Sequence, residues 1–139
     1  MGRGEAAEEG KGMLRKILIV DDDDLTARLL SSRLKEAGYE IITAQTGEDA
    51  LQKMTSARPD AVIMDIMLPD MQGSDVVGHF QDQPDSHDIK VIFLSGIISQ
   101  ADAEIQQIRI GDKFYPAIGK PVDFKQLLEL LSAAEKVSP

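Results

Sequence analysis

Short apolar runs alternate along the chain with segments in which apolar residues recur at helical spacing. Five runs are rich in aliphatic residues and end at polar or turn residues, which is typical of buried strands. The predicted strands are residues 16–20, 40–44, 60–64, 89–94 and 114–118. Runs that are apolar on both faces are characteristic of strands in a parallel sheet.

Between the strands, apolar residues lie three and four positions apart, which predicts amphipathic helices. The predicted helices are residues 24–37, a short helix between Thr46 and Pro59, residues 73–81, residues 99–110 and a last helix that starts at Asp123. Strand and helix thus alternate five times. This order predicts an α/β fold in which a doubly wound, five-stranded parallel sheet carries five helices on its two faces.

Composition and charge narrow the class of protein. The 139 residues suit one domain, which we place at residues 14–135 between tails at 1–13 and 136–139. The chain has no cysteine, which excludes disulfides and thiolate metal sites. No apolar run approaches the ~20 residues of a membrane span, and residues 1–12 lack the apolar segment of a secretory signal, so we expect a cytoplasmic protein. The net charge of −9 argues against direct binding of nucleic acid.

Polar residues that can take part in catalysis or metal binding follow four of the five predicted strands. Asp21 and Asp22 follow the first strand, Asp65 the third, Ser95 the fourth and Lys120 the fifth. Taken singly, each has a simpler interpretation as a helix cap, a turn residue or a solvated lysine. The carboxyl ends of parallel strands share one edge of the sheet, so we expect these side chains to converge.

Such a convergence favours phosphoryl chemistry. Three carboxylates in one crevice require protons or a cation to offset their charge. Oxygen ligands without histidine or cysteine favour a hard cation, and Mg²⁺ is the natural choice. Lys120 supplies a compact positive charge suited to phosphoryl oxygens, and Ser95 supplies a hydroxyl. These groups suit the transfer of a phosphoryl group to an aspartate.

The ordered set of motifs resembles the receiver domains of two-component response regulators. The similar segments are residues 17–23 (ILIVDDD), 65–73 (DIMLPDMQG), 92–96 (IFLSG) and 120–121 (KP). The resemblance covers residues 14–135 and implies a flavodoxin-like, CheY-like fold with strand order 2-1-3-4-5. It also implies a signalling phosphoacceptor domain that catalyses only its own phosphorylation and dephosphorylation.

The resemblance also implies a set of metal-binding residues. Asp65 would be the phosphoacceptor and one ligand of Mg²⁺. Asp22 would bind the ion directly, Asp21 directly or through water, and Met67 through its carbonyl oxygen. Met67 stands two residues after the acceptor, where a side chain can shield an acyl phosphate from water, so we expect slower dephosphorylation than with a polar residue at this position.

Further roles follow from the same resemblance. Lys120 would contact the phosphoryl group, and Ser95 would hydrogen-bond it and couple it to the conformation. The donor would be a phosphohistidine on a sensor histidine kinase or a histidine phosphotransfer domain. A homodimer or a downstream protein would use the face formed by helix 99–110, strand 114–118 and the last helix. Ala117 stands where the family usually has the aromatic residue that tracks the serine, so this coupling is in question.

Two other functions compete with this interpretation. A haloacid-dehalogenase-like, Mg²⁺-dependent phosphatase also combines an Asp-x-Asp motif with a serine and a lysine, and Asp21, Asp23, Ser95 and Lys120 could fill those roles. That class has no use for Asp65 and its Pro-Gly loop. The second alternative is a receiver-like interaction module that works without phosphorylation.

Overall fold

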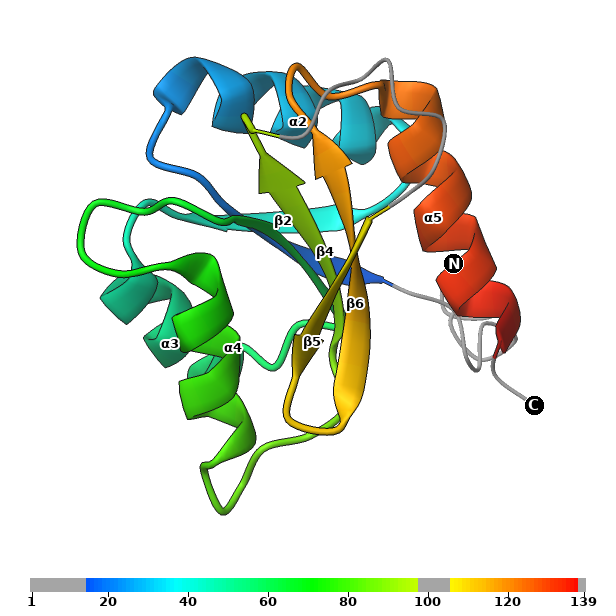
Figure 1. The fold of residues 1–139 in the computed structure, drawn as a ribbon. Helices are drawn as coiled ribbons and strands as arrows, with labels where there is room; N and C mark the ends of the chain where they lie inside the picture. Colours follow the sequence, from blue (N-terminus) through cyan, green and yellow to red (C-terminus); the bar gives the residue numbers. More distant parts are fainter. Residues whose placement is uncertain (1–14, 98–105, 138–139) are drawn as a thin grey trace.

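The computed structural model describes residues 15–97 and 106–137 (Figure 1). The strands are β1 (Lys16–Val20), β2 (Glu40–Ala44), β3 (Ala61–Asp65), β4 (Lys90–Ser95), β5 (Gln106–Ile110) and β6 (Lys113–Gly119). The helices are α2 (Asp24–Glu36), α3 (Gly47–Ser56), α4 (Gly73–Gln81) and α5 (Phe124–Val137). None of the helices in this part of the chain has the length and apolar character needed to cross a membrane.

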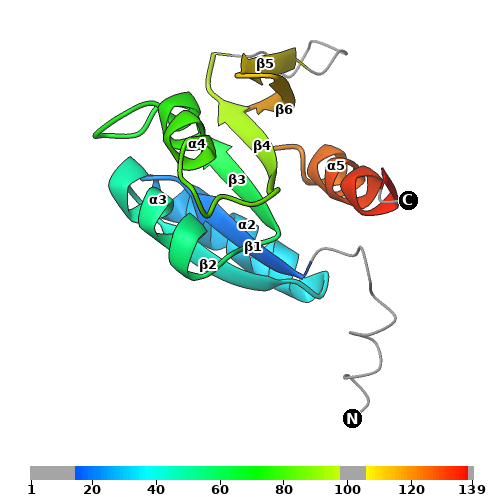
Figure 2. The ribbon, with the colours of Figure 1, turned by 90° about the horizontal axis from the view of Figure 1, so that it is seen from below.

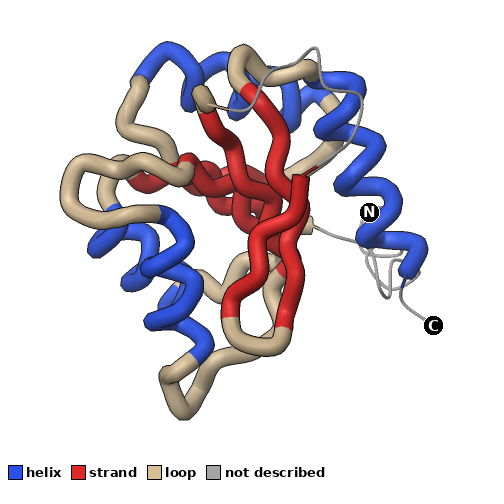
Figure 3. The backbone as a smooth tube through the Cα atoms, viewed as in Figure 1, coloured by secondary structure: helices blue, strands red, loops and turns tan. Residues whose placement is uncertain are grey.

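A single sheet with the order β2-β1-β3-β4-β6-β5 forms the middle layer. The neighbouring pairs from β2 to β6 are all parallel, and β6 is the fifth strand that the sequence predicts. The expected parallel order is therefore confirmed. Figure 3 shows the strands between two layers of helices.

Each face of the sheet buries its own apolar cluster beneath two helices. The helices α3 and α4 cover one face, where Met54 and Phe80 pack on Val62 and Phe93. The helices α2 and α5 cover the other face, where Leu34 and Leu127 belong to the second cluster. Figure 2 shows these two pairs of helices on opposite sides of the strands. Because β1 and β3 are apolar on both faces, they occupy the centre of the sheet.

The predicted helix 99–110 is wrong over its last five residues. Gln106–Ile110 forms β5, which pairs antiparallel with β6, and residues 99–105 lie outside the described part of the chain. The sheet therefore has six strands, and four helices are described where five were expected. The Gly111-Asp112 loop explains the difference, since Gly111 has φ +63° and two-residue loops of this kind close hairpins.

Candidate functional site

The register of the sheet brings the predicted site residues to one edge. Asp65 is the last residue of β3, and it pairs with Leu94, the neighbour of Ser95. Asp21 directly follows β1, the neighbour of β3 on the other side. Ser95 pairs with Gly119, which directly precedes Lys120. The convergence that the sequence predicts at this edge is present in the structure.

A lysine bridges two of the carboxylates. Lys120 Nζ lies 3.0 Å from Asp21 Oδ2 and 3.1 Å from Asp65 Oδ2. The Asp21 side chain is fully buried, and that of Asp65 is only 9% exposed. Burial of these two neighbouring carboxylates is tolerable because a partly buried ammonium group lies between them.

The protonation equilibria reflect this crowding. Burial raises the pKa of Asp65 above its ordinary value, the charge of Asp21 raises it further, and Lys120 only partly offsets both effects. Burial alone would lower the pKa of Lys120, but its close contacts with the carboxylates of Asp21 and Asp65 outweigh burial and raise that pKa. Lys120 is therefore a cation at neutral pH, and the negative charge that Asp65 carries when ionised is only partly compensated.

The acidic cluster has the donor set that a hard divalent cation prefers. Asp21, Asp22 and Asp65 each offer a carboxylate oxygen, and these oxygens lie within 4.8 Å of one another. Asp21 Oδ1 accepts a hydrogen bond from the backbone N–H of Asp23 at 2.9 Å. Asp21 Oδ2 is buried and, within the described residues, contacts Lys120 without a well-formed hydrogen bond. Asp22 is exposed, so the cluster opens to water on one side. These features fit Mg²⁺, which binds a few carboxylates and retains water.

The loop after Asp65 folds back on itself and presents Met67. The N–H of Leu68 donates to the carbonyl of Met71, and the N–H of Gly73 donates to the carbonyl of Ile66. This pair of bonds forms a bridge between Met67 and Gln72 that does not use the carbonyl of Met67. Met67 also donates its N–H to Asp65 Oδ1 at 3.3 Å, and its side chain is exposed.

Glycine is required where this loop enters α4. A Cβ atom at Gly73 would collide with the backbone carbonyl of Asp65. The fixed backbone of Asp65 offers no way to relieve the collision. Gly73 therefore allows α4 to begin directly beneath the candidate acceptor.

Asp70 has a structural role that sequence reasoning missed. Its carboxylate accepts from the backbone N–H groups of Gly47 at 2.7 Å and Glu48 at 3.0 Å. These two bonds hold the pKa of Asp70 below its ordinary value. Asp70 thus supplements the N-cap residue Thr46, whose hydroxyl accepts from the backbone N–H of Asp49 at 3.0 Å. The loop after Asp65 is thereby fastened to the N-terminus of α3.

Ser95 lies beside the site, with its hydroxyl directed to its own loop. The side chain is buried, and Oγ accepts from the backbone N–H of Ile97 at 3.1 Å. Its carbonyl accepts from the N–H of Lys120 at 3.0 Å, which couples the ends of β4 and β6. Among the described contacts of Ser95, none joins its hydroxyl to Asp65.

No aromatic residue of β6 takes the place of Ala117 next to Ser95. Tyr115 is buried, stacks edge-on against Phe93 and accepts a hydrogen bond from Gln81 of α4. It stands four residues before Gly119, the partner of Ser95, which is about 13 Å along a strand. The other aromatic residue of β6 is largely exposed. The position of Tyr115 thus excludes it as a direct contact of Ser95 in this conformation.

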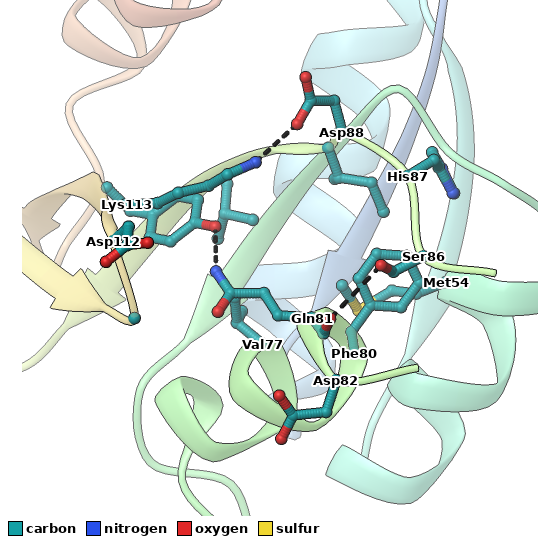
Figure 4. Close-up of a pocket in the computed structure, with 14 residues that line it drawn as sticks. Met54, Val77, Phe80, Gln81, Asp82, Ser86, His87, Asp88, Asp112 and Lys113 are labelled. Atoms are coloured by element: carbon teal, nitrogen blue, oxygen red, sulfur yellow. Dashed lines mark hydrogen bonds and ion pairs between the residues drawn. The ribbon is translucent and has the colours of Figure 1, made fainter. Parts of the chain in front are cut away.

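A cavity of about 410 Å³ lies away from the acidic cluster, at the other end of β4. Figure 4 shows the Lys113–Asp88 ion pair and the Gln81–Tyr115 hydrogen bond across it. His87 lies at this cavity and packs edge-on against Phe80. None of the predicted site residues lines the cavity, so we do not assign the carboxylate chemistry to it.

Comparison with known proteins gives one consistent family. The family model described as response regulator receiver domain matches residues 17–132. The polar-differentiation response regulator DivK of Brucella anthropi is 30% identical over 122 residues, which cover 87% of this chain and 96% of DivK. A CheY-like receiver domain from Methylobacillus flagellatus has a similar structure, with a TM-score of 0.71, 26% identity and coverage of 87% of this chain and 98% of that chain.

Longer regulators also match this chain. The alkaline phosphatase synthesis transcriptional regulatory protein PhoP of Bacillus subtilis is 34% identical over 96 residues, which are 69% of this chain. The match spans only 38% of PhoP, and the match to the response regulator PleD of Caulobacter vibrioides spans 24% of that protein. The similarity is therefore to one region of these larger proteins.

Proposed function

This chain belongs to the response regulator receiver family, and we propose that Asp65 is the residue on which it accepts a phosphoryl group. The observation that carries the proposal is the contact between Asp65 Oδ2 and Lys120 Nζ, at a strand end shared with two further carboxylates. A carboxylate at the carboxyl end of a strand in an α/β sheet, in contact with a cation, is positioned for phosphoryl transfer.

The proposed reaction is transfer from a phosphohistidine of a sensor histidine kinase or a phosphotransfer domain. An oxygen of Asp65 attacks phosphorus and forms the new P–O bond. The P–N bond to the imidazole breaks, and the ring nitrogen keeps the electron pair and is then protonated. Lys120 is positioned to attract the phosphoryl oxygens, because its Nζ already lies 3.1 Å from the acceptor carboxylate.

The acidic cluster would hold Mg²⁺ through Asp21, Asp22, Asp65 and the carbonyl of Met67. A bound Mg²⁺ neutralises charge on phosphoryl oxygens and so favours an anionic donor approaching an anionic acceptor. The buried oxygen of Asp21 and the open carbonyl of Met67 support this assignment. Asp21 also forms an ion pair with Lys120, and this contact keeps the ammonium group next to Asp65.

Ser95 would report phosphorylation by exchanging its hydrogen bond. Its hydroxyl now accepts from Ile97, and rotation would let it donate to a phosphoryl oxygen on Asp65. The backbone bond from Lys120 to Ser95 would pass the change to β6 and α5. We propose that downstream proteins contact the surface formed by β6 and α5. The β5–β6 hairpin takes the place, in this surface, of the last part of the predicted helix 99–110.

An apolar groove beside Lys120 supports docking of the phosphohistidine partner. It has a volume of about 220 Å³ and lies between α2 and the start of α5. Leu29 is 58% exposed there, and Arg33 lies over the ring of Phe124 at 4.4 Å. We propose that a helix of the partner covers these residues while its histidine reaches Asp65, and that the exchange takes place in the cytoplasm.

The phosphatase alternative is not favoured by the family or by the geometry. In that class Asp21 would be the nucleophile, yet its side chain is fully buried. A nucleophile requires access for its substrate. The alternative of an interaction module without phosphorylation is separated from the proposal by the experiment that follows.

The proposal is tested by incubating the protein with phosphoramidate and Mg²⁺ and measuring the intact mass. We expect the wild type to gain one phosphoryl group and Asp65→Asn to gain none. Asp70→Asn is the matched control, because Asp70 belongs to the same loop but caps α3. Retention of phosphorylation in Asp65→Asn, or its loss only in Asp70→Asn, would contradict the assignment. A wild type that gains nothing would favour the interaction module.

A further inference from the structure

The strand β5 ends the sheet with an edge that is open in the described part of the chain. It pairs with β6 on one side, and within residues 15–97 and 106–137 no strand pairs with its other side. Figure 2 shows β5 and β6 at the end of the sheet farthest from β2. An open edge presents unpaired N–H and C=O groups to another strand.

The hairpin determines which backbone groups the edge presents. In a hairpin with a two-residue loop, the residues next to the loop, here Ile110 and Lys113, form a hydrogen-bonded pair. Such pairs alternate along an antiparallel ladder, so Ile108 also bonds to β6. The N–H and C=O groups of Gln107 and Arg109 therefore point away from β6, toward the open side.

The edge is held in place from below and from the side. Ile108 and Ile110 pack against the core cluster that includes α4. Gln81 of α4 donates to the carbonyl of Ile110 at 3.4 Å and to the hydroxyl of Tyr115 at 2.7 Å. A strand held in this way loses little conformational entropy when it binds another strand.

The hairpin is also largely independent of the rest of the sheet. Only residues 117–119 of β6 pair with β4, and cavities of about 410 and 380 Å³ flank the unpaired part on the two faces. Pro116 contributes to this separation, because its missing N–H lies on the side of β4 and not on that of β5. The hairpin thus projects an edge strand whose own ladder is complete.

We propose that β5 pairs antiparallel with β5 of a second copy of this chain, about a two-fold axis at Ile108. In this register, Gln107 of one copy faces Arg109 of the other, so the outward backbone groups pair with one another. Ile108 faces its own equivalent across the axis. The result is a continuous sheet through two domains, and the pairing does not depend on phosphorylation of Asp65.

Charge does not oppose a second copy of the chain at this edge. The chain has a net charge of −9, whereas the hairpin carries two cations, Arg109 and Lys113, and one carboxylate, Asp112, and Lys113 is paired with Asp88 at 2.6 Å. The hairpin is thus a nearly neutral region of a strongly acidic protein, so two copies repel each other little there. The register also places each Arg109 opposite a neutral Gln107, so no like charges face each other directly.

The absence of native cysteine allows a direct test by crosslinking. In the proposed pairing, the two Ile108 Cα atoms lie about 4.5 Å apart, as in a non-hydrogen-bonded pair, which a disulfide can span. The two Gln107 Cα atoms are diagonal neighbours about 7–8 Å apart, which is too far. We expect oxidised Ile108→Cys to double in mass on a non-reducing gel, while matched Gln107→Cys remains monomeric. Failure of Ile108→Cys to crosslink, or equal crosslinking of both variants, would overturn the proposal.

A proline substitution tests the same pairing without a crosslink. Gln107→Pro removes an N–H that faces the second copy and leaves the β5–β6 ladder intact, as edge strands permit. Gln107→Ala keeps that N–H. By sedimentation over a range of concentrations, we expect wild type and Gln107→Ala to dimerise and Gln107→Pro to remain a monomer with an unchanged circular dichroism spectrum. A dimeric Gln107→Pro would refute the edge pairing. A monomeric wild type would refute it as well, and so would a wild type in which this edge binds only a different protein.

Discussion

Asp65 carries a charge that the fold does not fully compensate. It is buried, it lies beside the charge of Asp21, and both carboxylates share one ammonium group. Such an arrangement costs stability and is typical of functional sites. The receiver fold thus maintains, at the edge of its sheet, a carboxylate whose charge a bound divalent cation would offset.

Asp65→Asn should therefore stabilise the metal-free protein. The pKa of Asp65 is raised in the folded state, so the cost of its ionisation is absent below the unfolded value of 3.8 and develops as the pH rises through the folded pKa. We expect the free energy of unfolding to increase at neutral pH, with no increase below pH 3.8. Urea unfolding with a chelator present, repeated at several pH values, measures this difference.

Asp70→Asn provides the control of opposite sign. The pKa of Asp70 is lowered by its bonds to Gly47 and Glu48, so its carboxylate contributes stability above 3.8 and loses it as the pH falls through the folded pKa. We expect this variant to lose stability at neutral pH. Equal effects of the two substitutions at every pH would contradict the electrostatic account.

Met67 should govern the lifetime of the acyl phosphate. Its side chain is 65% exposed and stands two residues after Asp65, where it can keep water from the phosphoryl group. We expect Met67→Asn to shorten the lifetime several-fold, because an amide side chain can orient water. The decay of the phosphorylated mass over time provides the measurement. A lifetime that is unchanged or longer in the variant would contradict this role.

At the scale of elements, most strands could be predicted because they must be apolar on both faces. The strands β1, β3 and most of β4 bury both faces, which gives continuous apolar runs that no surface element shares. The strand β5 is an edge strand with one face exposed, so its apolar residues are few. Ile105 and Ile108 fit a helical spacing, whereas the alternation of Ile108 and Ile110 before Gly111 fits a hairpin. Pairing with β6 decides between the two, and that pairing is a tertiary effect.

Glycine substitutions test the hairpin against a matched helical position. Gly111 has φ +63°, so Gly111→Ala should cost about 1 kcal/mol of stability by straining the loop. Gly78→Ala should stabilise by roughly 0.5–1 kcal/mol, because Gly78 is inside α4 and a Cβ there would lie at an ordinary 3.8 Å from Ile110. Thermal unfolding of both variants provides the comparison. A neutral Gly111→Ala would contradict the hairpin.

At the scale of the whole molecule, the candidate site could be predicted because topology alone brings it together. Parallel strands with right-handed crossovers place Asp21, Asp65, Ser95 and Lys120 on one edge whatever the details of the loops. The contact of Asp70 with α3 could not be predicted. Its partners Gly47 and Glu48 are 23 and 22 positions away in the sequence, and only the conformation of the loop brings them together. The direction of the Ser95 hydroxyl could not be predicted either, since it depends on one local hydrogen bond.

The topology also separates the two functions that we propose. The acidic cluster lies at the carboxyl ends of the parallel strands, whereas the open backbone groups of Gln107 and Arg109 lie along the edge of the sheet. The strand β6 connects them, because it pairs with β5 and ends next to Lys120.

The identity of the phosphorylated residue tests the central claim most directly. The protein is treated with phosphoramidate and Mg²⁺, the acyl phosphate is reduced with borohydride, and peptides are sequenced by mass spectrometry. Reduction converts a phosphorylated aspartate to homoserine and so marks its position. We predict homoserine at position 65 alone. Homoserine at position 21, 22 or 70, or at no position, would contradict the account.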